Sequence, residues 1–395
     1  AEDGIRDIGV TGVQTCALPI SAVVFMAALA ACSAPPPAPP PTRPAAVPWV
    51  GAASAPLPLA TSVHRSVIDP AQGDVIGELQ VTRTTKEDTF VDLARLFNVG
   101  YEELVRANPG VDPWLPGEGR EIVLPTRFIL PDAPREGIVI NLAAMRLFYY
   151  PPRAPGDWQT VYTFPIGIGR VGWATPEGTT SVLRMTKDPV WRPGAGVRAE
   201  HKENGEILPA VVPAGPDNPL GSRALYLGWP TYLIHGTNKP AGVGLRSSHG
   251  CIRLFPEDVE LLYDLVKPGV KVTVVNQPFV FGWHEGELMM QAHDVLEDDP
   301  RDWRGAQRKL ISKSLAARIQ KQLRDRGETM DWDAVARFSH DPRGVPVPLS
   351  RQGVSMPAVI AEARRVRNAT PLGANIASSG AAVMPAGAAA VRAAP

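Results

Sequence analysis

The sequence predicts a mostly β domain of sandwich-like or barrel-like form over residues 135–277, with a small α+β module before it and a helical extension after it. Three observations lead to this fold class. Short β-branched and aromatic runs follow one another through the centre of the chain, with few helical segments between them. A strand, two helices and a strand precede these runs. Apolar residues at helical spacing follow them.

The central domain contains five runs typical of strands. They are Gly137–Asn141, Arg146–Tyr150, Val161–Pro165, Thr180–Met185 and Tyr232–His235. Pro256–Lys267 predicts a helix, because Pro256 lies in its first turn, acidic residues follow it, and Pro268 and Gly269 end it. We expect Val270–Val275 to return to strand.

The module over residues 78–125 has a predicted βααβ order. Its strands are expected at Leu79–Val81 and Glu121–Leu124, and its helices at Phe90–Phe97 and Tyr101–Ala107. The spacing of apolar residues in the two helices is that of amphipathic surface helices. This module is predicted to be a separate small domain.

The region over residues 278–340 is predicted to form a hairpin and a helix. Phe279–Trp283 and Glu287–His293 are expected to pair through the turn between them. Ala306–Arg326 is basic and carries apolar residues at helical spacing, typical of a packing face, with a membrane-surface or partner-binding role as the alternative. Residues 341–395 are predicted to be a low-complexity, disordered tail.

The N-terminal part carries signs of processing rather than of a fold. Residues 1–20 resemble a translation of sequencing-library adaptors; the alternative is a genuine polar tail. Residues 21–32 form an apolar stretch too short to span a bilayer, which predicts a truncated signal segment and export from the cytoplasm. Residues 33–77 are predicted to be a linker, because eight prolines lie within 35–48.

The chemistry of the chain is expected at Cys251. A thiol with a pKa near ~8.5 is mostly protonated at neutral pH, so a nucleophilic cysteine needs a base, and His235 at a strand end is the candidate. Glycine at position 250 lets the backbone approach a substrate carbonyl, and its N–H is a candidate oxyanion donor together with that of Cys251. Arg253 is suited to a bidentate pair with a carboxylate.

Residue chemistry by itself leaves two other interpretations open. Cys251 can be a buried structural cysteine, or it can form a zinc site with His235 and His249. Two features favour the nucleophile. A glycine directly precedes the cysteine, and no Cys-x-x-Cys pair is present to complete a structural zinc site.

The run His235-Gly236-Thr237 followed by Ser248-His249-Gly250-Cys251-Ile252-Arg253 resembles the active-site signature of the YkuD family of L,D-transpeptidases. The resemblance implies a YkuD-like β fold, a Cys251 nucleophile, a His235 proton donor and acceptor, and a Gly236 carbonyl that orients His235. It places Ser248, His249, Arg253 and Tyr232 at the substrate. It implies no metal and no cofactor, and inactivation by carbapenems.

Two further resemblances concern the parts before this domain. Asp88–Leu104 with Ala107-Asn108-Pro109 resembles a LysM domain, which implies binding to peptidoglycan glycan; the alternative is an α+β linker domain without glycan affinity. Leu29-Ala30-Ala31-Cys32 resembles a lipoprotein cleavage box, which implies lipidation of Cys32, with an ordinary signal peptide as the alternative. The expected location is the periplasm, with a lipid anchor as the membrane contact.

The expected function is transfer of a peptidoglycan tetrapeptide stem through a Cys251 thioester, to form 3-3 crosslinks or to attach an outer-membrane lipoprotein. An L,D-carboxypeptidase or hydrolase using the same thioester is the alternative within enzymes. A non-catalytic peptidoglycan-binding anchor is the alternative outside them. The formal net charge of +0 gives no support for a nucleic-acid partner.

Overall fold

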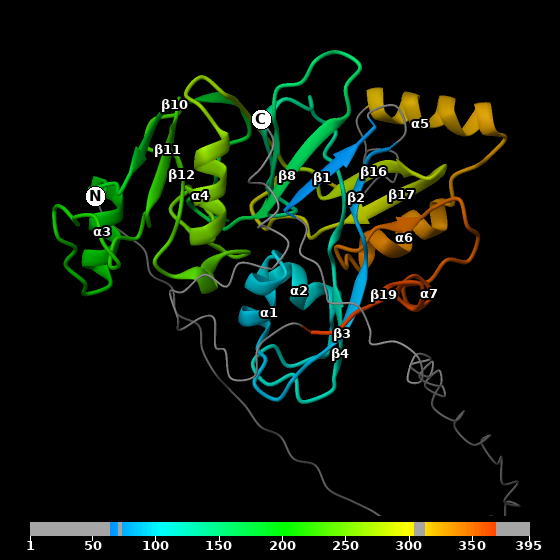
Figure 1. Cartoon of the computed structure of the whole chain (residues 1–395), viewed down its shortest axis with the longest axis horizontal. Helices are drawn as coiled ribbons and strands as arrows, with labels where there is room; N and C mark the ends of the chain where they lie inside the picture. Colours follow the sequence, from blue (N-terminus) through cyan, green and yellow to red (C-terminus); the bar gives the residue numbers. More distant parts are fainter. Residues whose placement is uncertain (1–63, 70–72, 304–312, 369–395) are drawn as a thin grey trace, which may run out of the picture. The chain divides into compact units, whose positions relative to one another are not determined.

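The computed structural model describes residues 64–69, 73–303 and 313–368 (Figure 1). The predicted adaptor-like segment 1–20, the signal segment 21–32 with Cys32, residues 33–63 of the predicted linker and residues 369–395 of the predicted tail lie outside this part of the chain. Within the described part, no helix combines the length and the apolar character needed to cross a membrane.

The central domain is built on a nine-stranded sheet in the order β1-β8-β7-β6-β15-β10-β11-β12-β14. The strands are β1 (Arg65–Ile68), β6 (Gly137–Asn141), β7 (Arg146–Tyr150), β8 (Gln159–Pro165), β10 (Gly178–Lys187), β11 (Arg223–Leu227), β12 (Leu233–His235), β14 (Ile252–Arg253) and β15 (Lys271–Val275). The two pairs β6–β15 and β12–β14 are parallel, and the others are antiparallel. The predicted mostly β domain is confirmed.

The core of this domain lies between the sheet and the helix that follows the cysteine motif. α4 (Pro256–Leu265) begins at the predicted proline and buries Val259 and Leu262. These side chains pack with apolar residues of the sheet, among them Ile234 and Ile252 from the strands that flank the site. Two shorter strands, β9 (Ile168–Gly169) and β13 (Arg246–Ser248), pair with each other in parallel.

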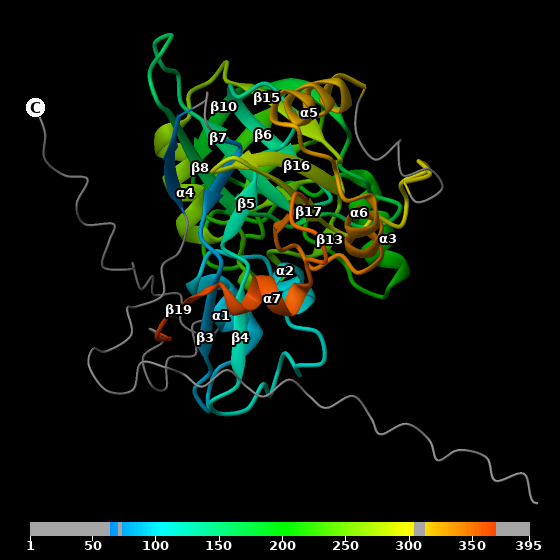
Figure 2. The ribbon, with the colours of Figure 1, turned by 90° about the vertical axis from the view of Figure 1, so that its right-hand side faces the viewer.

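The predicted βααβ order is present in the module. β3 (Gln80–Arg83) pairs antiparallel with β4 (Glu121–Leu124), and α1 (Phe90–Leu96) and α2 (Tyr101–Ala107) lie between them in the chain (Figure 2). The module, predicted as a separate small domain, is in contact with the central sheet. Its Glu103 forms a buried ion pair with Arg146 of β7, so the module and the central sheet share polar contacts.

Two strands occur where a linker is predicted. β1 pairs with β8, and β2 (Val75–Gly77) pairs with β5 (Arg127–Ile129), so the prediction of a linker over 33–77 is wrong from residue 64 onward except at 70–72, which the structure does not describe. Both strands are three or four residues long. Their partners are distant in the sequence, so no local pattern marks them.

The extension contains the predicted hairpin of β16 (Phe279–His284) and β17 (Glu287–Ala292), and β18 (Val347–Pro348) adds a third strand. α5 (Lys313–Arg326) and α6 (Trp332–His340) belong to this part (Figure 1). Leu315, Ile319 and Leu323 of α5 are buried in a shared core with the hairpin. The predicted packing face is therefore confirmed for α5, and residues 306–312 of the predicted helix lie outside the described part of the chain.

The prediction of a disordered tail is wrong for residues 341–368. This stretch forms β18, α7 (Met356–Ala361) and β19 (Arg364–Arg365). β19 pairs in parallel with β3 (Figure 2). Val366 is buried in the core of the module. β19 gains its order from β3, far away in the sequence, and β18 from the hairpin strand β17, and composition reveals neither pairing.

Candidate active site

Parallel pairing of β12 and β14 brings the two halves of the cysteine motif together. Ile234 lies opposite Ile252, and His235 lies opposite Arg253. Cys251 directly precedes β14, so its backbone enters the sheet beside the strand that ends in His235. The predicted approach of these two segments is confirmed, and Ile234 and Ile252, the one β-branched residue of each strand, are both fully buried where the strands pair.

The His235 imidazole is fixed by its own strand end. The residue is 3% exposed, and its Nδ1 lies 2.6 Å from the carbonyl oxygen of Gly236. A carbonyl only accepts, so Nδ1 carries the proton and Nε2 is left as the basic atom. This is the orienting contact predicted for Gly236.

Burial keeps His235 neutral. Desolvation, with a smaller contribution from the charge of Arg253, lowers the pKa of His235 to about 3, although contacts with the Gly236 and Leu220 backbone act in the opposite direction. Burial also raises the pKa of the Cys251 thiol, against the effects of the Leu233 backbone and of Arg253. At neutral pH the free protein therefore holds a neutral thiol beside a neutral imidazole.

This charge state predicts the pH dependence of thiol alkylation. We expect the rate of Cys251 alkylation by iodoacetamide to rise through a midpoint above the ordinary thiol pKa, because burial disfavours the thiolate. Mass spectrometry of the peptide containing Cys251 at a series of pH values measures this. A plateau that begins near pH 4–5 would instead indicate a thiolate–imidazolium pair and contradict the assignment.

A tight turn presents the thiol. Ser248 Oγ donates to the Cys251 carbonyl oxygen at 2.6 Å and accepts from the Gly250 N–H at 3.1 Å. Ser248 is 1% exposed, so it holds the turn, and its predicted place at the substrate is not what the structure shows. The Gly250 N–H is engaged as well, which leaves the Cys251 N–H as the candidate oxyanion donor in this structure.

Glycine is required at position 250 for two reasons. Its φ of +97° lies in the region that L-residues rarely adopt, and a Cβ there would lie 2.8 Å from Tyr232 Cε1. The carbonyl of Gly250 accepts from Thr175 Oγ1 at 2.9 Å. Tyr232, predicted at the substrate, lies against the turn that carries the nucleophile, with its ring also edge-on to Trp229.

Comparison with known proteins decides the family. The model of the YkuD L,D-transpeptidase catalytic domain matches residues 135–274. The probable L,D-transpeptidase YcfS of Escherichia coli is 38% identical over 314 residues, which cover 77% of this chain and 94% of that protein. This chain belongs to the YkuD L,D-transpeptidase family. The probable L,D-transpeptidases ErfK/SrfK and YbiS of Escherichia coli are 40% and 42% identical, with 65% and 60% of this chain and 81% and 77% of those proteins covered.

Sequence reasoning missed Thr231 in this L,D-transpeptidase domain. Its carbonyl oxygen accepts from the Cys251 thiol at 3.5 Å. Its φ is +72°, which is strained for a β-branched residue. The strain lies in the backbone that the nucleophile touches, and no local sequence signal marks it.

Arg253 is placed where the prediction needs it, beside the reacting groups. Its charge acts on the pKa of both Cys251 and His235. Its Nη1 makes only long contacts with Ser247, at 3.4 and 3.5 Å, and its Nε is buried without a hydrogen-bond partner. Among the residues that the structure describes, Arg253 forms no ion pair. A partly buried guanidinium without an ion-pair partner favours an anionic ligand.

The His249 side chain is in contact with Arg170, Glu200 and Trp173. Its Nε2 lies 3.0 Å from Glu200 Oε2 and 3.2 Å from Arg170 Nη2, and its ring stands edge-on to Trp173 at 4.9 Å. Glu200 belongs to α3 (Ala195–Glu203), a helix that the sequence analysis did not predict. The zinc interpretation required His249 beside His235; within the described residues, no group of three or more His, Cys, Asp or Glu side chains is placed to hold a metal ion.

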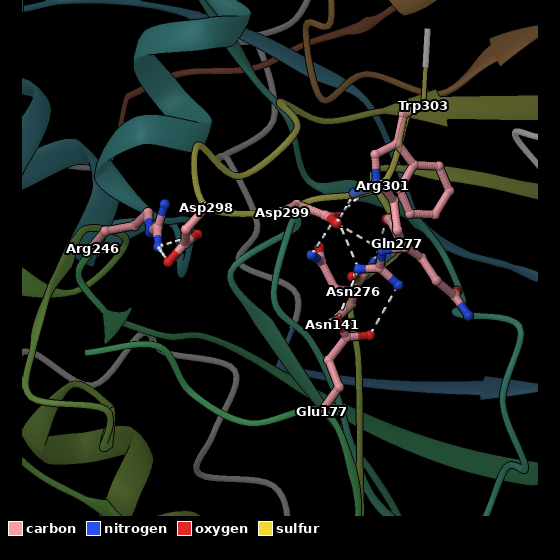
Figure 3. Close-up of polar contacts among 9 residues, drawn as sticks. All are labelled: Asn141, Glu177, Arg246, Asn276, Gln277, Asp298, Asp299, Arg301 and Trp303. Carbon is pink, nitrogen blue, oxygen red and sulfur yellow. Dashed lines mark hydrogen bonds and ion pairs between the residues drawn. The ribbon is translucent and has the colours of Figure 1, made fainter. Parts of the chain in front are cut away.

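Residues 294–303 are in contact with β13, the strand that leads into the cysteine motif. Arg246 of β13 donates to both oxygens of Asp298 at 2.8 Å. Arg301 binds Glu177, which precedes β10, and Figure 3 shows both pairs on the same connecting segment. This segment therefore fixes β13 and, through it, the turn that carries Cys251.

Proposed function

We propose that this protein is a periplasmic L,D-transpeptidase that transfers a peptidoglycan tetrapeptide stem through a thioester on Cys251. The observation that carries the proposal is the pairing of β12 with β14, which sets an oriented His235 beside the Cys251 turn. Family membership supports the reaction class. The acceptor is an amine, supplied by another stem or by an outer-membrane lipoprotein.

Acylation of the thiol begins from the neutral pair. The Cys251 sulfur attacks the carbonyl carbon that precedes the terminal D-alanine, while its proton passes to His235 Nε2. The C–S bond forms, the C–N bond breaks, and the proton from His235 leaves with the D-alanine amine. The Cys251 N–H is placed to stabilise the oxyanion of the tetrahedral intermediate.

Transfer of the acyl group reverses these roles. An acceptor amine attacks the thioester carbonyl, His235 takes the amine proton, and the sulfur leaves to regain a proton from His235. The Arg253 guanidinium is suited to hold a substrate carboxylate beside the reacting carbon.

Two features support attachment to the cell wall. The βααβ module is similar in its element order to LysM domains, and it exposes Trp114, which is 60% accessible and lies 6.3 Å from the Tyr101 ring. Aromatic faces of this kind suit sugar rings. We propose that residues 78–125 bind wall glycan and that lipidation of Cys32 anchors the protein to a membrane.

The test is detection of the acyl-enzyme with the full-length protein. A disaccharide-tetrapeptide is incubated with and without an amine acceptor, and the adduct is mapped to the peptide containing Cys251. An adduct equal to the stem without its terminal D-alanine, discharged faster by the amine than by water, is the expected result. Equal discharge by water would favour a carboxypeptidase, and no adduct with retained peptidoglycan binding would favour an anchor.

A further inference from the structure

The wall beside Cys251 carries an excess of positive charge. Arg253 has no ion-pair partner among the described residues; burial lowers the pKa of its guanidinium, and the nearby charge of Arg170 lowers it further. The Arg170 backbone N–H donates to the Ser248 carbonyl oxygen at 3.1 Å, which fixes Arg170 next to the catalytic turn. Among the described residues, the carboxylate that pairs with Arg170 is that of Glu200.

Glu200, which pairs with Arg170, belongs to the surface helix α3. α3 has no buried residue. Its Gly196 lies against the Trp173 ring, where a Cβ would lie 2.9 Å from Cη2, and Glu200 binds Arg170 and His249. Partial desolvation acts to raise the pKa of Glu200, but the bonds from Arg170 and His249 outweigh it and lower the pKa, so the carboxylate is ionised.

We propose that Arg170 is a second carboxylate subsite, which Glu200 occupies in the free protein and which a substrate carboxylate takes over on binding. Arg253 and Arg170 then hold two carboxylates on the same substrate. The ligand class is a peptide with one carboxylate at its D-alanine end and another on the side chain of the residue before the scissile bond. This inference rests on the proposed function, since it assigns the stem class that the site selects.

The chemistry of Arg170 supports this exchange. Glu200 and a substrate carboxylate present the same two oxygens to the guanidinium, so one replaces the other without leaving the cation unpaired. Glu200 is on the long connection between β10 and β11. When Glu200 leaves Arg170, few apolar contacts are lost, because α3 has no buried residue. The Glu200 carboxylate therefore competes for Arg170 with ligands that have the second carboxylate. It does not compete with ligands that lack this group.

The experiment compares two tetrapeptides that differ only in that carboxylate. One has diaminopimelate before the terminal D-alanine, and the other has lysine, which keeps the side-chain amine. Dissociation constants are measured by calorimetry with the full chain carrying Cys251→Ala, so that no turnover occurs. We expect tighter binding of the diaminopimelate peptide, but by less than the roughly tenfold to hundredfold of one new charge-assisted pair, because the substrate carboxylate displaces Glu200 from Arg170.

Two variants in this background separate the proposal from a loss of folding. Arg170→Gln is expected to remove the preference. Glu200→Gln is expected to strengthen binding of the diaminopimelate peptide about tenfold or more and to leave the lysine peptide unchanged. Glu206→Gln is the matched control: Glu206 pairs with His201 at 2.7 Å just beyond α3 and should change neither constant.

The outcomes keep this inference apart from the proposed function. An unchanged preference in Arg170→Gln, or weaker diaminopimelate binding in Glu200→Gln, would overturn the second subsite. Acylation of the unsubstituted protein by the same peptides is followed in parallel by mass spectrometry. Failure of acylation with the expected binding pattern would reject the transpeptidase reaction and leave the subsite standing.

Discussion

Replacing His235 with alanine is expected to slow acylation of Cys251 by about 10²–10⁴-fold, the usual contribution of a positioned general base. The physical reason is the charge state of the pair. Burial raises the pKa of the thiol, so little thiolate is present at neutral pH and the proton must leave during the attack. Cys251→Ala is expected to abolish acylation, because the sulfur atom that forms the thioester is then absent.

The measurement is the rate at which the stem adduct appears on the intact protein. His340→Ala is a suitable control, since His340 is an exposed residue at the end of α6. Iodoacetamide alkylation adds a second criterion. A neutral His235 contributes no charge to the thiol, so its removal should leave the midpoint of the alkylation profile nearly unchanged, whereas loss of an imidazolium partner would raise it. If the His235→Ala variant were acylated at the wild-type rate, a residue other than His235 would be the base.

Local sequence patterns were sufficient for much of the central fold. β6 and β7 have the predicted bounds, and α4 starts at Pro256, because β-branched runs and a proline followed by acidic residues act through neighbouring positions. β1, β2 and β19 were not predicted. Each is a short strand whose order comes from a distant partner, so the information lies in the tertiary pairing.

The residues of the candidate active site were likewise predicted where local sequence specifies them and missed where tertiary structure brings them in. The motif specified His235, Gly236 and Cys251, since their chemistry depends on residue type and close spacing. It did not specify Arg170 or Glu200, which reach the site from a turn and from a charged helix without an apolar stripe. Ser248 was predicted at the substrate and the Gly250 N–H as an oxyanion donor, whereas in the structure they bond to each other within the turn, which spacing does not reveal.

The second large effect is expected at a buried ion pair that takes no part in the chemistry. Arg146 of β7 and Glu103 of α2 have side chains that are 1% and 4% exposed, with Nη2 and Oε2 2.7 Å apart. Arg146 also donates to the Asn98 carbonyl oxygen at 3.0 Å, and its guanidinium lies 3.8 Å from the centre of the Phe128 ring. Glu103 accepts from the Gly100 N–H at the start of α2. The pair therefore joins the βααβ module to the central sheet.

Glu103→Ala is expected to lower the free energy of unfolding by about 3–5 kcal/mol, because it leaves the Arg146 charge buried without a partner. Urea unfolding followed by circular dichroism measures the change. The matched control is Glu78→Ala, which removes an ion pair with Arg364 whose side chains are 56% and 47% exposed, and which should cost no more than about 1 kcal/mol. Equal effects of the two substitutions would contradict the assignment.

The double variant Arg146→Met with Glu103→Leu distinguishes the cost of a stranded charge from the value of the pair. Desolvation of two ions offsets most of their attraction, so apolar side chains of similar size are expected to recover much of the stability lost in Glu103→Ala. Recovery would mean that the pair serves mainly to fix how the module meets β7. Without recovery, the network of Arg146 with Asn98 and Thr163 would itself be the source of stability.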